Sequence, residues 1–204
     1  MYTPAHFAIE DLPVCHDLIE ANEFGLLVTA AGDAPEATHL PFVLERSEGG
    51  NGVLYAHMAR ANQQWKSFGD RPVLCVFSGA HAYVSPTWYA ADGPAVPTWN
   101  YSAVHCYGRP EIIEDPSRRD WLMDRLSQRY EGGGPWSYPA LPGKFRDAMI
   151  KGIVAFRIPI ERLEGKAKLS QNKSAEDREA LAQGLDGTGG AMEAEIARAM
   201  RGAG

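Results

Sequence analysis

The stretch HMARANQQWKSF, His57–Phe68, concentrates hydrogen-bond donors directly after an apolar segment that is typical of a strand. His57, Arg60, Asn62 and Lys66 provide an imidazole, a guanidinium, an amide and an ammonium group in this short segment. A phosphate is bound by cationic and amide donors that converge from a strand end and the start of a helix. The stretch is therefore a candidate phosphate site, and the alternative is a polar corner that simply meets water.

Two neighbouring stretches, FSGAHAYVSPTWY and VPTWNYSAVHCYG, are rich in aromatic side chains. Trp88 and Trp99 lie there together with Tyr83, Tyr89 and Tyr101. Such rings form flat apolar walls with polar tips, which suit a planar aromatic ligand or a subunit interface. A large aromatic core is the alternative interpretation, and composition alone favours it.

Polar residues also gather in LEGKAKLSQNKS, Leu163–Ser174, directly after the clearest strand pattern of the chain. Lys166, Lys168, Ser170 and Gln171 lie in this segment. It is either part of a binding site or a polar exit from the strand into the C-terminal tail, and composition favours the exit.

Other chemistries find less support in the sequence. Neither HxH nor HxxxH spacing occurs among four histidines that could act as ligands, His39, His57, His81 and His105. We therefore expect no metal site, and haem ligation by one of these histidines is an alternative. The chain lacks a P-loop, a GxGxxG and a GxSxG motif. No pair of carboxylates identifies a catalytic acid and base, so no catalytic residue is predicted.

Composition limits the class of protein and its partners. The chain has 204 residues, of which 45% are hydrophobic, and its formal net charge is −6. This composition allows a full core, and the acidic balance disfavours nucleic acid as a partner. Cys15, Cys75 and Cys106 form no close pair, which is typical of a reducing compartment. Because no signal peptide is recognised and no segment has the roughly 18 apolar residues of a membrane span, we expect a soluble cytoplasmic protein.

Apolar periodicity predicts the elements that position these residues. Strands are expected over residues 24–30, 38–45, 52–58, 71–79, 81–86, 102–114 and 152–165. Helices are expected over residues 9–23, 61–68, 116–130, 144–152 and in the tail from 174 onward. Since helices rarely alternate with the strands, the pattern predicts a mostly β (α+β) chain, an antiparallel barrel with helices packed outside.

Two helix starts carry capping signals. Asp115 precedes a proline in the first helical position, Pro116, and is expected to be an N-cap. Ser174 with Asp177 resembles a capping box at the start of the tail.

Six motifs, in order along the chain, identify a known family. MYTPAHFA, HLPF, HMARANQQWK, GAHAYVSPTWY, VPTWNYSAVHCYG and KLSQNK resemble the PaiB family, the FMN-binding negative transcriptional regulators. The resemblance runs from Met1 to about Asn172, more than four fifths of the chain. It implies an antiparallel split β-barrel of the FMN-binding type with peripheral helices, similar to pyridoxamine-phosphate oxidases and flavin reductases. It also implies a homodimer with FMN in clefts between the subunits.

The resemblance assigns residues 1–172 to the FMN-binding domain and residues 173–204 to a helical tail, packed on the domain or on a partner subunit. It implies a phosphate contact at a strand end, main-chain contacts to the isoalloxazine from the preceding strand, and further walls from the aromatic and Lys-rich stretches. The expected cofactor-binding residues are Thr38, His39, Leu40, Pro41, His57, Met58, Arg60, Asn62, Trp99, Asn100, Lys168, Ser170 and Gln171. Pro41 lacks an N–H, and the oxidases usually carry a Ser/Arg/Lys set where this chain has His57, Arg60 and Asn62.

Three functions are consistent with the sequence. The first is an FMN-binding split-barrel protein that acts as a flavin-dependent oxidoreductase or as a flavin-responsive regulator. The second is a transcriptional repressor that acts directly or through a partner; the acidic net charge and the single weakly basic stretch, Arg162–Lys173, disfavour direct DNA binding. The third is a haem-binding split-barrel protein.

Overall fold

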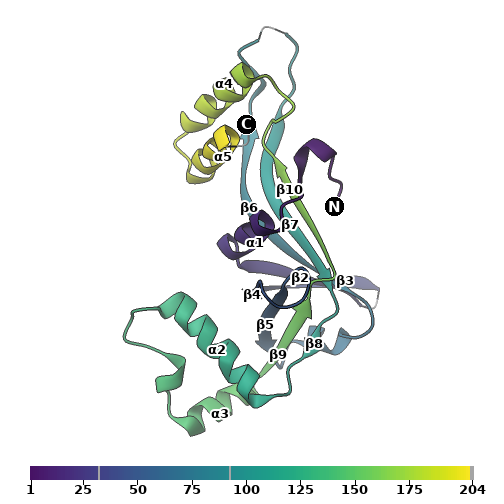
Figure 1. Cartoon of the computed structure of the whole chain (residues 1–204), viewed down its shortest axis with the longest axis vertical. Coiled ribbons are helices and arrows are strands. Elements are labelled where there is room, and N and C mark those ends of the chain that lie inside the picture. Colours follow the sequence, from purple (N-terminus) through teal and green to yellow (C-terminus); the bar gives the residue numbers. More distant parts are fainter. Residues whose placement is uncertain (32, 92, 203–204) are drawn as a thin grey trace. The chain divides into compact units, whose positions relative to one another are not determined.

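The computed structural model describes residues 1–31, 33–91 and 93–202 (Figure 1). The strands are β1 (Ala8–Ile9), β2 (Phe24–Ala31), β3 (Ala34–Pro41), β4 (Val43–Glu45), β5 (Val53–Ala59), β6 (Val73–Val84), β7 (Thr98–Gly108), β8 (Glu111–Ile112), β9 (Ile153–Pro159) and β10 (Arg162–Lys168). The α-helices are α1 (Leu12–Ala21), α2 (Pro116–Glu131), α3 (Gly143–Lys151), α4 (Ala175–Asp186) and α5 (Ala191–Gly202). The 3-10 helices are η1 (Ala5–Phe7), η2 (Gln63–Ser67), η3 (Pro86–Trp88) and η4 (Tyr138–Ala140). Within these described ranges, no helix is long and apolar enough to cross a membrane.

Most elements lie where the apolar periodicity predicts them, and the differences have local causes. β3 begins at Ala34, inside the predicted turn, because residues 34–37 continue the ladder with β2. The strand predicted over 38–45 is divided at Phe42, whose N–H leaves the ladder and donates to Glu23 O at 2.9 Å. The strands predicted over 71–79 and 81–86 are one continuous strand, β6.

The chain forms two compact units, and each is described by itself. Unit 1 comprises Met1–Leu18, Ser78–Val104 and Glu164–Gly204. Unit 2 comprises Ile19–Phe77 and His105–Leu163. The long strands β6 and β7 contribute residues to both units.

Unit 2 is built from antiparallel strands, as the sequence predicts. β2 pairs with β3 along its whole length and with the first part of β6. A second sheet has the order β4-β5-β9-β8, and all three of its pairings are antiparallel. Apolar side chains that are fully excluded from solvent fill this unit, among them Leu27, Leu54, Phe156 and Ile158.

The burial pattern of β6 changes phase along the strand. Its buried side chains are Val73, Cys75, Phe77, Ala80, Ala82 and Val84. Successive strand residues point to opposite faces, so the shift from odd to even numbers means that opposite faces of β6 are buried before and after Gly79. A Cβ at Gly79 would lie 2.2 Å from Ser102 Oγ and 3.4 Å from Ser102 O, so a larger residue here would require the Ser102 side chain of β7 to move.

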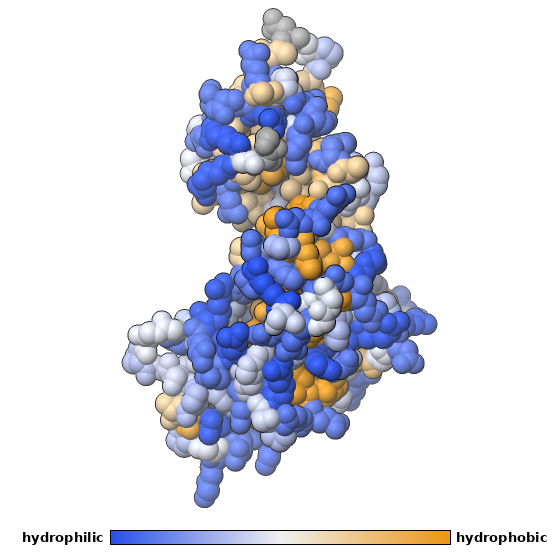
Figure 2. All heavy atoms as spheres, viewed as in Figure 1, coloured by the Kyte–Doolittle hydropathy of each residue, from blue (hydrophilic) through white to orange (hydrophobic). Residues whose placement is uncertain are grey.

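Helices α4 and α5 pack against each other in unit 1 and cover the second half of β6 (Figure 1). Their buried apolar residues are Leu181, Ala182, Leu185, Ile196, Ala197 and Met200. On the face drawn in Figure 2, the outer surface of these two helices is mostly hydrophilic, as expected for amphipathic helices on a core. The ring of Trp88 in η3 packs against Gly184 of α4.

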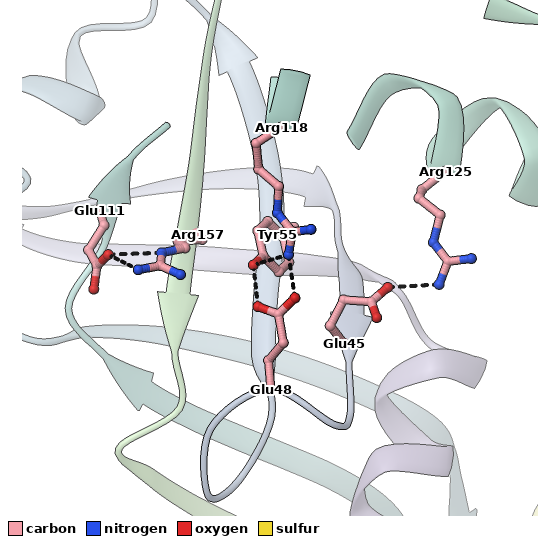
Figure 3. Close-up of polar contacts among 7 residues, drawn as sticks. All are labelled: Glu45, Glu48, Tyr55, Glu111, Arg118, Arg125 and Arg157. Carbon is pink, nitrogen blue, oxygen red and sulfur yellow. Dashed lines mark hydrogen bonds and ion pairs between the residues drawn. The ribbon is translucent and has the colours of Figure 1, made fainter. Parts of the chain in front are cut away.

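Helix α2 is attached to the second sheet of unit 2 by a polar cluster around Tyr55 (Figure 3). Tyr55 is fully buried, and its hydroxyl donates to Glu48 Oε2 at 2.5 Å. Arg118 of α2 donates to Glu48 and to Tyr55 Oη, and its guanidinium carbon lies 3.9 Å from the Trp121 ring centroid. Burial raises the pKa of Glu48, but hydrogen bonds from Tyr55 and Arg118 outweigh burial and hold that pKa below its ordinary value of 4.5.

Substitution of Gly184 by Ala should destabilise the protein. The new Cβ would lie 2.5 Å from a ring carbon of Trp88, and overpacking of this kind costs about 1–3 kcal/mol, more than the roughly 1 kcal/mol gain in helix propensity. We expect a lower melting temperature by circular dichroism. Gly187→Ala is the matched control, because its nearest neighbouring atoms lie 3.5 Å away. Equal melting temperatures for the two variants would mean that the ring turns aside at little cost.

Substitution of Glu48 by Gln should change the pH dependence of stability. A carboxyl whose pKa is lowered by folding stabilises the protein above its unfolded pKa, and this contribution is lost as the pH falls through the folded pKa. The loss of unfolding free energy in Glu48→Gln should therefore be largest at neutral pH and shrink below pH 4.5. Urea unfolding at several pH values measures this. The exposed Glu131 of α2, the helix to which Arg118 belongs, provides the control variant, Glu131→Gln. A pH-independent difference for Glu48→Gln would contradict the expectation.

Candidate functional site

The corner between β5 and η2 brings two of the predicted cofactor-binding residues together. Asn62 has extended backbone angles and caps η2, because its side-chain oxygen accepts from Gln64 N at 2.9 Å. Its Nδ2 donates to Thr38 Oγ1 of β3 at 2.9 Å. The amide therefore connects the start of η2 with β3, and both of its polar atoms are engaged.

Gln64 is a key residue of this corner that the sequence reasoning did not single out. It is only 2% exposed, and the two N–H groups of its Nε2 are shared among Leu27 O, Thr29 Oγ1 and Glu36 O at 3.1–3.3 Å, while its buried Oε1 has no hydrogen-bond partner among the described residues. These bonds attach η2 to the β2–β3 hairpin. A buried amide surrounded by strand acceptors is a structural anchor. In the sequence, only the position of Gln64 two residues after the helix cap Asn62 indicates this role.

Arg60 supports the end of α3. Its Nε donates to Lys151 O at 2.9 Å and its Nη2 to Ile153 O at 2.8 Å, while its guanidinium lies 5.9 Å from the Trp65 ring centroid. A guanidinium next to the last carbonyls of a helix is favourably placed for the helix dipole. Nη1 has no hydrogen bond within the described part of the chain, so a share of the donor capacity of Arg60 remains unused.

His57 and Met58 lie next to each other on β5 but differ in environment. Met58 is buried and lies opposite Val154 of β9, so its side chain belongs to the core. His57 is largely buried, and burial lowers the pKa of its imidazole. Its Nδ1 is buried and has no hydrogen-bond partner among the described residues. An unpaired buried imidazole nitrogen is costly, and such a group is a candidate contact for a ligand.

The predicted main-chain segment lies at the end of β3, which is an edge strand of its sheet. His39 is exposed and stacks on Phe24, with ring centroids 5.8 Å apart. The side chain of Leu40 is buried, and Pro41 has no N–H to donate. This segment can therefore offer carbonyl oxygens, the N–H groups before Pro41 and the exposed imidazole, but no further polar side chain except Thr38.

Three of the predicted residues of unit 1 close the turn between β10 and α4. Asn100 is fully buried; its Nδ2 donates to Ser170 Oγ at 3.0 Å and lies 3.3 Å from Met200 Sδ. Gln171 accepts from Leu169 N at 2.7 Å through its side chain. Ser170 has a φ of 62°, a strained backbone state that these hydrogen bonds help to hold. Their side chains are thus used within the fold.

Among the predicted residues of unit 1, Trp99 is the most exposed, and Lys168 is half-buried. Trp99 is 53% exposed, and its ring centroid lies 5.8 Å from that of His81 and 6.2 Å from that of Tyr83. Lys168 Nζ donates to Thr98 Oγ1 at 2.5 Å and to Trp99 O at 2.6 Å. Burial, and next the charge of Lys166, lower the pKa of Lys168.

A cavity of about 350 Å³ lies elsewhere in unit 2, and none of the predicted residues lines it. Its apolar lining consists of Ile19, Phe42, Val43 and Leu44. Its charged groups are engaged in ion pairs, such as Arg129 with Glu23 at 2.7 Å.

Across the described residues, no three His, Cys, Asp or Glu side chains are grouped as metal ligands would be.

Comparison with known proteins identifies the family. Residues 1–162 match the family FMN_bind_2, described as "Putative FMN-binding domain". The chain is 35% identical to "Protease synthase and sporulation protein PAI 2" of Bacillus subtilis, over 87% of this chain and 85% of that protein. It is also 31% identical to an uncharacterised protein of Emericella nidulans, over 93% of this chain and 92% of that protein. These matches confirm the resemblance found in the sequence motifs.

Solved structures agree with the fold. The flavocytochrome Anf3 of Azotobacter vinelandii is similar with a TM-score of 0.64 and 17% identity, over 79% of this chain and 69% of that chain. The FAD and haem binding protein of Mycobacterium smegmatis gives a TM-score of 0.61 and 16% identity, over 84% and 78% of the two chains. At these identities the similarity concerns the fold alone, and it confirms the predicted split barrel of the flavin-binding type. The chain belongs to the FMN_bind_2 family of FMN-binding domains.

Proposed function

We propose that this chain is a flavin-dependent oxidoreductase that holds FMN at the corner where β5 meets η2. The observation that carries the proposal is the unpaired, buried Nδ1 of His57 in a chain of an FMN-binding family. Arg60, three residues later, retains an unused guanidinium nitrogen. Together the two groups supply donors of the kind that a phosphate needs.

The roles of the chain's own residues follow from their environments. Arg60 provides a positive charge, while His57 is expected to be neutral at physiological pH because burial lowers its pKa. Thr38 and Asn62 are fixed by their mutual hydrogen bond and present main-chain groups beside the corner. Because the side chains of Leu40 and Met58 are buried, these two residues would contact FMN only through their main-chain atoms. When bound, FMN would supply the capacity to accept and donate electrons.

We further propose that the chain forms a homodimer in the cytoplasm. The edge strand β3 is largely exposed, and Phe24 on its neighbour β2 is 66% exposed. Exposed edge strands and large exposed apolar side chains are typical of surfaces that a partner covers. All three cysteines are free and buried, which is consistent with a reducing compartment.

Flavin titration of the wild type and of Arg60→Ala tests the cofactor proposal. We expect saturable binding at one FMN per chain, monitored by quenching of flavin fluorescence. Loss of a charge-assisted contact should weaken FMN binding of Arg60→Ala by about 1.5–3 kcal/mol. Arg109→Ala is the matched control, because Arg109 also donates to a main-chain carbonyl, Asp70 O at 2.7 Å, within unit 2. Unchanged affinity in a folded Arg60→Ala variant, or equal losses in both variants, would refute a phosphate contact of Arg60.

Size-exclusion chromatography with light scattering tests the dimer. Phe24→Glu places a charge on the proposed interface, and we expect a shift from dimer to monomer. Phe145→Glu serves as the control, since Phe145 is 52% exposed on α3. A wild type that is monomeric, or a Phe24→Glu variant that stays dimeric, would exclude this surface as the interface.

A further inference from the structure

The cavity of about 350 Å³ in unit 2 is lined by residues of α2, β4 and the end of α1. All of its lining residues belong to this one unit. Ligand pockets in proteins typically measure about 300–1,000 Å³ and combine apolar walls with a few polar groups. Since none of the residues expected to bind FMN lines this cavity, it is a separate feature of the unit.

The apolar part of the lining belongs to the core of unit 2. Ile19, Phe42 and Leu44 are 1%, 3% and 8% exposed, and Val43 is half-buried. Val43 also packs against the buried cluster that contains Leu122 of α2. An aliphatic chain placed against such a lining is removed from water, which is favourable for each methylene group.

The two carboxylates of the lining are already neutralised. Glu20 accepts from Nε and Nη2 of Arg46 at 2.8 and 2.6 Å, one bond to each carboxylate oxygen. Glu23 accepts in the same way from Nε and Nη2 of Arg129, at 3.2 and 2.7 Å. These are bidentate pairs, the strongest arrangement of a guanidinium and a carboxylate. Neither acid is therefore a free negative charge that would repel an anion.

The arginines of the lining, by contrast, have donors left. A guanidinium carries five N–H donors, and Arg125 uses one, from Nη2 to Glu45 Oε1 at 2.7 Å (Figure 3). Arg129, four residues later on the same face of α2, keeps both N–H groups of Nη1. The side chains of Arg125 and Arg129 are 47% and 57% exposed, so a ligand can reach these donors. The unused capacity of the charged groups is thus for an acceptor.

We propose that this cavity, the α2–β4 cavity, binds an aliphatic monocarboxylate. The chain would lie against the apolar lining, and the carboxylate would accept N–H groups of Arg125 and Arg129. A carboxylate suits a guanidinium because the two can form parallel hydrogen bonds, which also fix the orientation of the ligand. The site goes beyond the proposed function, because it concerns another ligand and shares no residue with the β5–η2 corner.

Isothermal titration calorimetry of the full chain with octanoate tests the site. We expect saturable binding of one octanoate per chain. Binding of 1-octanol, which has the same chain without a charge, should be weaker by roughly tenfold or more, the effect of losing a charge-assisted hydrogen bond. Butanoate, which keeps the charge but lacks four methylene groups, should also bind about tenfold or more weakly, because less apolar surface is buried.

Two substitutions at one ion pair should change the octanoate affinity in opposite directions. Arg125→Gln removes the donors and should weaken binding by roughly tenfold. Glu45→Gln removes the carboxylate that competes for Arg125 and should tighten binding. A partly exposed ion pair contributes little to stability, so both variants should fold, which melting curves verify. Mere disturbance of the pair would shift the affinity of both variants in the same direction.

Arg157→Gln is the matched control. Arg157 of β9 forms the same kind of ion pair in unit 2, with Glu111 at 2.7 Å, but it does not line the cavity (Figure 3). Its affinity for octanoate should equal that of the wild type. The proposal is overturned if octanoate does not saturate, if 1-octanol or butanoate binds equally well, if a folded Arg125→Gln binds like the wild type, or if Glu45→Gln weakens binding as Arg125→Gln does.

Titration of the same proteins with FMN separates this inference from the flavin proposal. If FMN binds and octanoate does not, the α2–β4 cavity fails as a site while the proposed function stands. If octanoate binds in the expected pattern and FMN does not, the proposed function fails while the site stands. Saturating FMN should leave the octanoate affinity unchanged, and full competition would overturn the assignment of a separate site.

Discussion

The structure depends on one constraint in β6, which has to serve two cores. Its odd-numbered side chains are buried up to Phe77, and its even-numbered side chains are buried from Ala80 onward. Because side chains of a regular strand alternate between its two faces, the odd-numbered face can be buried in one segment and the even-numbered face in the next. The buried face changes between Phe77 and Ala80, beside Gly79, where a Cβ would lie 2.2 Å from Ser102 Oγ of β7. The first half of β6 can then complete the antiparallel strands of unit 2, while the second half carries α4 and α5 in unit 1.

Buried side-chain amides fix the corners of each unit. Gln64 attaches η2 to three acceptors of the β2–β3 hairpin, and Asn100 holds the strained turn at Ser170. Some polar side chains in motifs that are typical of ligand binding thus form their hydrogen bonds within the fold. A buried amide has to be hydrogen-bonded, so its partners are decided by the interior before any ligand is considered. The groups that remain for chemistry are the few that the interior leaves unpaired, such as His57 Nδ1 and Gln64 Oε1.

Charge acts locally in this protein. The formal net charge of −6 disfavours nucleic acid as a partner, yet it does not describe the local charge on β10, where Lys166 and Lys168 lie two residues apart. There the acidic neighbour, Glu164, forms an ion pair with the N-terminal ammonium group of Met1. Around Tyr55 the opposite holds, because Glu48 and Arg118 satisfy each other and the buried hydroxyl. The cluster around Tyr55 therefore satisfies its charges internally, whereas the two lysines of β10 have no carboxylate partner among the described residues.

The sequence by itself determined the features that depend on close neighbours along the chain. The sequence predicted the helix caps at Asp115 and Ser174, because each cap involves residues only a few positions apart. It also identified the FMN-binding family, because the family's motifs are short patterns that occur in a fixed order. Only the tertiary structure decided which donors of those motifs stay available. Gln64 meets an acceptor 37 positions away, Asn100 bonds a residue 70 positions away, and Lys166 meets one 164 positions away. A sequence shows which groups can donate, but the acceptor that each one reaches depends on the tertiary fold, because strand pairing and packing bring distant segments within hydrogen-bond distance.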